Sequence, residues 1–152
     1  MPNPKTADEW FLLGDQHFDE ARYSLAGPSS HRSLSRSASQ AAESYLKGLL
    51  CKSHPNLDLR EYRHNLLSLL NCVVKTYPDM ASAREDIELL SSVSYGSSDD
   101  GEPLSCSTSA EAYYEPDLKV DDNEARAHVR AAETVAKMAH RALGRDSDAC
   151  YE

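Results

Sequence analysis

Apolar side chains recur every three or four residues over most of this chain, the spacing that places them on one face of an α-helix. Five stretches show this spacing: one from Thr6 to Gly27, and four over about residues 30–52, 58–77, 80–93 and 121–143. No stretch of the chain alternates apolar and polar residues with the period of two expected of a half-buried β-strand. The pattern therefore predicts an all-α fold.

Local signals predict where several of these helices begin and end. Thr6 and Glu9 fit a capping box, in which the threonine hydroxyl accepts from the third helical amide and the glutamate reaches back. Asp58 is expected to cap the third helix, and Pro78 to end it, because the residue before a proline is pushed out of helical geometry. Gly144 is a natural stop for the last helix.

The second stretch carries an unusually wide apolar stripe, which implies contact with more than one helix. Its apolar residues are Leu34, Ala38, Ala41, Ala42, Tyr45, Leu46 and Leu49. The small residues among them, together with Gly48, allow a neighbouring helix to approach closely. Two interpretations stay open: core packing within one chain, or a seam with a second copy. Long helices at both ends of the sequence, with shorter ones between, suit an antiparallel four-helix bundle with one additional helix.

Length and composition favour a single domain over residues 1–144. A chain of 152 residues is long enough to bury one core without staples. Residues 94–112 are rich in Ser, Gly and Asp and poor in apolar side chains, so they are predicted to form a mobile acidic loop. Residues 145–152 are expected to be a flexible C-terminal tail.

The charge balance limits the partners that the chain can have. The formal net charge is −9, so the protein is not expected to bind an extended nucleic acid through a general field. No apolar run approaches the roughly 20 residues of a membrane-spanning helix, and residues 1–5 lack the apolar stretch expected of a signal peptide. We therefore expect no membrane and a cytoplasmic location. The four cysteines form no C-x-x-C pair and are expected to be free thiols.

Two segments resemble a known family. Residues 37–50 read SASQAAESYLKGLL, and a second apolar helix opens with RHNLLSLL over residues 63–70. This order, an Ala-rich helix, a short polar loop and a helix that opens on a polar pair, resembles the HEPN family of all-helical domains (higher eukaryotes and prokaryotes nucleotide-binding). The resemblance implies an HEPN-like bundle that pairs as a homodimer. The roles it implies are a nuclease toxin, a nucleotide- or RNA-binding module, or the non-catalytic partner of a small nucleotidyltransferase.

The nuclease motif of that family is absent from this chain. The motif is an Arg followed by four to six residues and then a His, whereas Arg60 precedes His64 by only three intervening residues. The family often shows an Arg-Tyr-Pro-Asp-like element before its last helix, where residues 113–117 read YYEPD and place an acid near the expected arginine. We therefore assign no catalytic residue and expect a non-catalytic binding and assembly module. An HEPN-type ribonuclease and a purely structural helical dimer are the alternatives.

No motif for a metal or a cofactor is present. The chain has no H-E-x-x-H or H-x-x-x-H pair and no Gly-rich phosphate loop. His128 and His140 are separated by twelve residues, about 120° around a helix, so they are not expected to share a metal ion. Glu124 and His128 could pair at i, i+4, which usually gives a contact on the helix surface. We expect neither metal nor cofactor.

One basic region stands out from the acidic background. Residues 28–64 hold six Lys or Arg against three carboxylates, whereas residues 94–122 hold one Lys against eight. At helical spacing these cations could line a groove between the second and third helices that binds a nucleotide or another compact anion. The candidate residues are Arg32, Arg36, Lys47, Arg63 and His64. The alternative is that they are solvated charges that pair with Glu43, Asp58 and Glu61.

Overall fold

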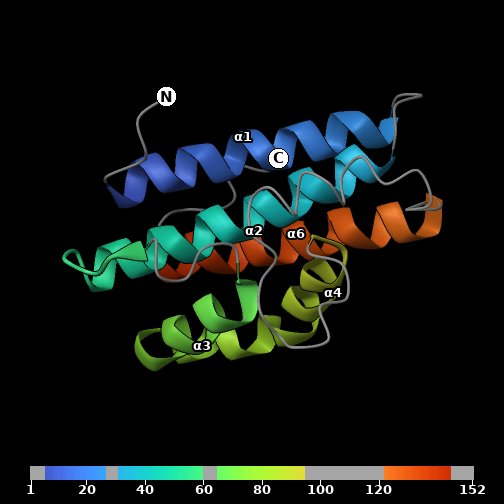
Figure 1. The fold of residues 1–152 in the computed structure, drawn as a ribbon. Coiled ribbons are helices and arrows are strands. Elements are labelled where there is room, and N and C mark those ends of the chain that lie inside the picture. Colours follow the sequence, from blue (N-terminus) through green and yellow to red (C-terminus); the bar gives the residue numbers. More distant parts are fainter. Residues whose placement is uncertain (1–5, 27–30, 60–64, 95–121, 145–152) are drawn as a thin grey trace.

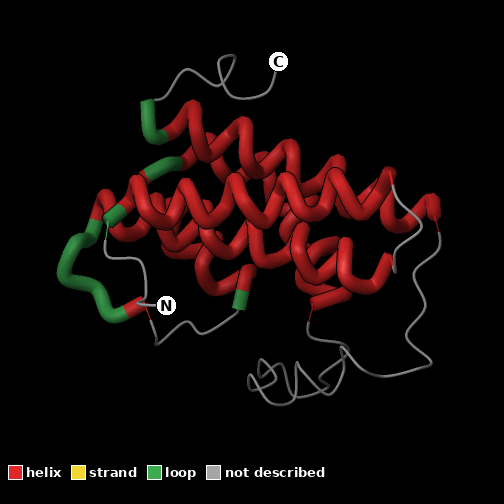
Figure 2. The backbone as a smooth tube through the Cα atoms, turned by 90° about the horizontal axis from the view of Figure 1, so that it is seen from above, coloured by secondary structure: helices red, strands yellow, loops and turns green. Residues whose placement is uncertain are grey.

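The computed structural model describes residues 6–26, 31–59, 65–94 and 122–144. Its helices are α1 (Ala7–Ala26), α2 (His31–Ser53), α3 (Leu66–Thr76), the 3-10 helix η2 (Pro78–Ala83), α4 (Arg84–Ser94) and α6 (Asp122–Ala142). No strand occurs among the described residues, which confirms the prediction of an all-α fold (Figure 2). Most of the predicted loop, 95–112, and the predicted tail, 145–152, lie outside these ranges.

Helix α2 is the centre of the structure, with α1, α6, α3 and α4 packed around it (Figure 1). The whole apolar stripe predicted for this helix is completely buried: Leu34, Ala38, Ala41, Ala42, Tyr45, Leu46 and Leu49. Helices of the same chain cover it, so packing within one chain accounts for its width. The four described helices around α2 explain why its apolar surface is wider than that of an ordinary amphipathic helix.

Contacts between distant residues give the directions of the three long helices. Glu20 lies against Ser37 and Phe11 lies against Gly48, so α1 and α2 run antiparallel. Ser35 bonds to His128, whereas Tyr45, ten residues further along α2, lies against His140. Helix α6 therefore runs parallel to α2 and antiparallel to α1. Of the three long helices, α1 is antiparallel to both others, and the predicted antiparallel order fails for α2 and α6. Along the sequence, α3, η2 and α4 come between α2 and α6. In space they lie together along one side of these two long helices (Figure 1).

Two glycines let α1 and α2 approach each other closely. A Cβ atom added to Gly48 of α2 would lie 2.5 Å from Cδ1 of Phe11, and one added to Gly14 of α1 would lie 2.8 Å from Cε1 of Tyr45. Each helix thus places an aromatic ring over a glycine of the other. We refer to this pair of contacts as the reciprocal glycine contact. It confirms that Gly48 allows close approach, and the neighbour that uses the space is α1.

The predicted helix ends at both termini of the described fold are confirmed. The backbone N–H of Glu9 donates to Oγ1 of Thr6 over 3.1 Å, and that hydroxyl donates to Oε1 of Glu9 over 3.2 Å. At the other end, Gly144 follows α6 with a φ of 85°, the left-handed conformation that favours glycine. Thr6 therefore caps the start of α1, and Gly144 ends α6, as the sequence predicts.

The third helix begins later than predicted. Asn65, not Asp58, is the N-cap of α3: its backbone is extended, and its side chain accepts from the backbone N–H of Ser68 over 3.0 Å. An asparagine is as good a cap as an aspartate, so composition alone does not decide between the two positions. The prediction that this helix ends before Pro78 is correct, because α3 ends at Thr76 and Tyr77 has left helical geometry.

The fourth helix was predicted to begin near Met80, but the structure forms a 3-10 helix first. Pro78 starts η2, and the N–H of Met80 bonds to the carbonyl of Tyr77 over 3.0 Å, three residues back. Helix α4 follows from Arg84. Proline at the first position fixes φ without loss of a needed donor, which suits a short 3-10 turn. The side chains of Met80, Ala83, Ile87 and Leu90 are buried.

The described helices also bear on the membrane question. None of them is both long enough and apolar enough to cross a bilayer.

Replacement of Gly48 by alanine tests the reciprocal glycine contact. Alanine raises helix propensity by about 1 kcal/mol, but the new methyl would overlap the buried ring of Phe11. Overpacking costs about 1–3 kcal/mol, so we expect Gly48→Ala to lower the free energy of unfolding by about 1 kcal/mol net, as measured by urea denaturation. In a Phe11→Leu background the same substitution should cost less. Equal or greater stability of the Gly48→Ala single variant would contradict the contact.

Candidate functional site

Three polar side chains from three helices meet in the core at one carboxylate oxygen. Oη of Tyr45 on α2 donates to Oδ1 of Asp15 on α1 over 2.5 Å, and Nε2 of His140 on α6 lies 3.0 Å from the same oxygen. An ionised carboxylate can only accept, so the imidazole nitrogen is the donor. Tyr45 and His140 are fully buried, whereas the side chain of Asp15 is 32% exposed. We call these three residues the Asp15 junction.

Aromatic rings pack around the junction. The ring of Phe11 meets the rings of both Tyr45 and His140 edge to face, with centroids 5.4 and 4.9 Å apart. Such edge contacts are the arrangement that aromatic quadrupoles favour. The phenol and the imidazole are therefore sealed from solvent, and only the carboxylate reaches the surface. A carboxylate beside an imidazole has the groups of an acid–base pair, but no substrate atom has access to the imidazole here.

A second buried histidine joins α2 to α6. Nδ1 of His128 lies 2.6 Å from Oγ of Ser35, and both side chains are buried. Burial disfavours the charged form of the imidazole and lowers the pKa of His128 below its ordinary value. A serine beside a histidine has the elements of an activated nucleophile, yet Ser35 is completely buried, so this pair fastens two helices.

The predicted anion site is described only in part. Arg63 and His64 lie outside the described residues, and of Arg32 only the backbone, in the first turn of α2, is described. Arg36 is half-buried on α2. Lys47 lies within about 20° of Arg36 around the helix but roughly 16 Å further along its axis. The structure therefore brings two of the five candidates to one side of α2 and does not describe the other three side chains.

Lys47 pairs with Glu43, as the alternative interpretation of the sequence expected, and also contacts Trp10, which the sequence did not indicate. Its Nζ lies 2.9 Å from Oε2 of Glu43 and 5.4 Å from the ring centroid of Trp10. The two partners of the ion pair are 9% and 13% exposed, so the pair is buried and not solvated. A lysine whose charge is balanced in this way attracts an external anion less strongly than a solvent-exposed lysine does.

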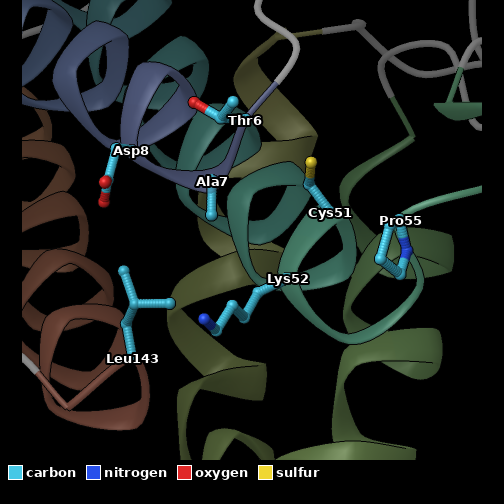
Figure 3. Close-up of a pocket in the computed structure, with 7 residues that line it drawn as sticks. All are labelled: Thr6, Ala7, Asp8, Cys51, Lys52, Pro55 and Leu143. Atoms are coloured by element: carbon cyan, nitrogen blue, oxygen red, sulfur yellow. The ribbon is translucent and has the colours of Figure 1, made fainter.

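A hollow of about 550 Å³ opens where the start of α1 meets the ends of α2 and α6 (Figure 3). Its lining residues are Thr6, Ala7, Asp8, Cys51, Lys52, Pro55 and Leu143. Burial, together with the carboxylate of Glu9, raises the pKa of the Cys51 thiol, so this cysteine stays protonated and is a poor nucleophile. The negative charge of Asp8 weakens the attraction that the ammonium of Lys52 would have for an anion in this hollow.

Histidine and carboxylate side chains form no metal site in the part of the chain that is described. No three His, Cys, Asp or Glu side chains there are grouped to hold an ion. His128 and His140 bond to Ser35 and Asp15 respectively, in separate places. His128, which at i, i+4 from Glu124 could have made a contact on the helix surface, is instead buried and bonds to Ser35 of α2.

Sequence reasoning missed both buried histidines, although a signal was present. His128, Ala132, Ala136 and His140 follow each other at intervals of four residues, so the two histidines continue the apolar face of the last helix. Their polar partners carry no such signal. Asp15 lies 125 residues from His140, and Ser35 lies 93 residues from His128, so only the tertiary fold brings them together.

The comparisons with known proteins leave the resemblance untested. No family model matches the sequence, and no curated protein and no solved structure matches the chain. The HEPN resemblance therefore stays a prediction from the residues.

The lowered pKa of His128 predicts a pH dependence of stability. Between the folded pKa and about 6.5, the unfolded chain binds the proton more readily, so the free energy of unfolding should fall as the pH drops below about 6.5. Urea denaturation at a series of pH values should show a smaller slope for His128→Asn, whose amide keeps a polar group near Ser35 without titrating in this range. His54→Asn, which changes an exposed histidine, is the control. Identical slopes for His128→Asn and the native protein would contradict the buried neutral imidazole.

Proposed function

We propose that this protein is a non-catalytic helical module that binds a ligand and assembles with a partner. We further propose that its helices form an HEPN-like four-helix bundle with one additional helix. The support for this arrangement is the all-helical fold around an Ala-rich central helix, α2, followed by the Leu-rich α3. The cytoplasmic location is part of the same proposal.

The observation that carries the proposal is that side chains capable of acid–base chemistry form buried hydrogen bonds between helices. His140 and Tyr45 are sealed against Asp15, and His128 is sealed against Ser35. A general acid or base must lie within hydrogen-bond reach of a substrate, which these buried groups do not allow. His128, His140 and Tyr45 thus stabilise the fold.

The ligand that we propose is a small phosphorylated molecule such as a nucleotide. Its binding residues would be Arg32, Arg36, Arg63 and His64, and Lys47 would add less because Glu43 already balances its charge. The local excess of cations over residues 28–64, within a chain of net charge −9, supports a compact anion over an extended polymer. Arginine is well suited to this role because its guanidinium can bind phosphate oxygens in pairs.

A partner is the other half of the proposal: a second copy of this chain or a small nucleotidyltransferase. The apolar stripe of α2 that first pointed to a homodimer is covered by α1, α3, α4 and α6 of the same chain. A second copy would therefore pair through other surfaces. Light scattering decides the point directly, because a monomer has a mass of 16.8 kDa.

Calorimetric titration with ATP and GTP tests the ligand. We expect modest binding that weakens as salt is added, and a loss of about tenfold or more in the Arg32→Ala, Arg63→Ala double variant, because two charge-assisted contacts are removed. Lys52→Ala, which removes an exposed cation of α2 outside the proposed site, is the matched control and should bind as the native protein does.

Two results would count against the proposed function. If neither nucleotide binds, or if the double variant binds equally well, the cations are solvated surface charges. The absence of catalysis is tested with the same preparations, which should degrade RNA no faster than a heat-inactivated sample. Metal-independent cleavage that is lost in His64→Ala would instead establish the ribonuclease alternative.

A further inference from the structure

The outer face of α1 exposes two large apolar side chains. Leu12 is 60% exposed and Tyr23 is 82% exposed. Among the described residues, the one other exposed large apolar side chain is Leu89 on α4, which is less open to solvent, at 37%. Single exposed apolar residues are common on protein surfaces, but two that share one helix face define a direction and a spacing.

Five exposed residues form a continuous stripe along α1. Asp8, Leu12, Gln16, Asp19 and Tyr23 follow at intervals of four, four, three and four residues, so they fall within a sector of about 80°. We call them the α1 stripe. It extends over roughly 22 Å, and Leu12 and Tyr23 are roughly 16 Å apart within it. The opposite face of the same helix, with Phe11, Phe18 and Ala21, is buried.

The stripe lies on a rigid support. The reciprocal glycine contact holds the backbone of α1 against α2, and the Asp15 junction ties the middle of α1 to α2 and α6. A surface that is held in this way loses little conformational freedom when a partner binds, which favours affinity. The two apolar side chains therefore keep a fixed separation.

The charge around these two side chains favours a positively charged partner. Helix α1 holds five carboxylates against the single guanidinium of Arg22. Two of those carboxylates, on Asp8 and Asp19, belong to the stripe, and those of Glu9 and Glu20 are exposed beside it. Asp19 pairs with Arg22 over 2.6 Å at the surface, and an exposed pair of this kind is worth little and is screened by salt. A second copy that docked α1 against α1 would set carboxylates against carboxylates.

We propose that the α1 stripe is a docking surface for a basic amphipathic helix of a partner protein. Apolar side chains of that helix would cover Leu12 and Tyr23, and its Lys or Arg residues would face the surrounding carboxylates. This surface is on a different helix from Arg32 and Arg36 and has the opposite charge. The proposal therefore stands or fails independently of nucleotide binding.

Fluorescence polarisation with a labelled probe tests this surface. The probe is a synthetic amphipathic helix made of leucine and lysine, and its counterpart is the same design with glutamate in place of lysine. We expect the native protein to bind the lysine peptide more tightly than the glutamate peptide, with an affinity that falls as salt is added. The Leu12→Gln, Tyr23→Gln double variant should bind the lysine peptide about tenfold or more weakly, because it lacks both apolar anchors.

Leu89→Gln is the matched control, because it removes the exposed leucine of α4 and leaves the stripe intact. It should bind the lysine peptide as the native protein does. Glutamine is a good helix former and all three positions are exposed, so circular dichroism should show these variants folded. The proposal is overturned if the native protein binds neither peptide, or if the control loses as much affinity as the double variant. A native dimer that the double variant dissociates would overturn it too, by assigning the stripe to a second copy.

Discussion

The structure depends on how closely α1 approaches α2. Phe11 of α1 lies over Gly48, and Tyr45 of α2 lies over Gly14, so an aromatic ring of each helix fills the space beside a glycine of the other. Any side chain at either glycine would push the two axes apart. Because the contact is reciprocal, it fixes the register of the pair as well as its separation. That register brings Asp15 to the hydroxyl of Tyr45.

The reciprocal glycine contact also determines which polar side chains meet in the core. Once Asp15 and Tyr45 meet, a third donor can reach the carboxylate, and His140 of α6 supplies it. A buried polar group without a partner costs about 1–3 kcal/mol, so a shift of α6 along α2 would be opposed at His140 and again at His128. These bonds, twelve residues apart on α6, hold it parallel to α2. The same arrangement places the imidazoles where they cannot act on a substrate.

The sequence predicts those parts of this fold that arise from local chemistry. Helix periodicity, the Thr6 cap, the stop at Pro78 and the left-handed Gly144 each depend on residues within one or two helical turns, and each is confirmed. The start of α3 was predicted wrongly because Asp58 and Asn65 are chemically equivalent caps. The 3-10 turn after Pro78 was missed because its pattern of apolar residues does not differ from that of a helix.

The candidate site was less predictable, because its parts come from distant segments. The Asp15 junction joins residues 15, 45 and 140, and no periodicity relates them. The basic residues that were predicted, in contrast, follow from a count of charges, which does not reveal that Lys47 is buried against Glu43 and Trp10. Burial decides whether a cation stabilises the fold or is open to a ligand, and the fold sets burial.

A double-mutant cycle between Asp15 and Tyr45 tests the central claim most directly, that the close approach of α1 and α2 brings the Asp15 carboxylate to the hydroxyl of Tyr45. Tyr45→Phe removes only the hydroxyl, and Asp15→Ala removes the acceptor, so helix propensity and packing changes cancel in the cycle. A hydrogen bond to a charged group predicts a coupling of about 1.5–3 kcal/mol in the free energy of unfolding. Additive effects, with a coupling below about 0.5 kcal/mol, would contradict the account.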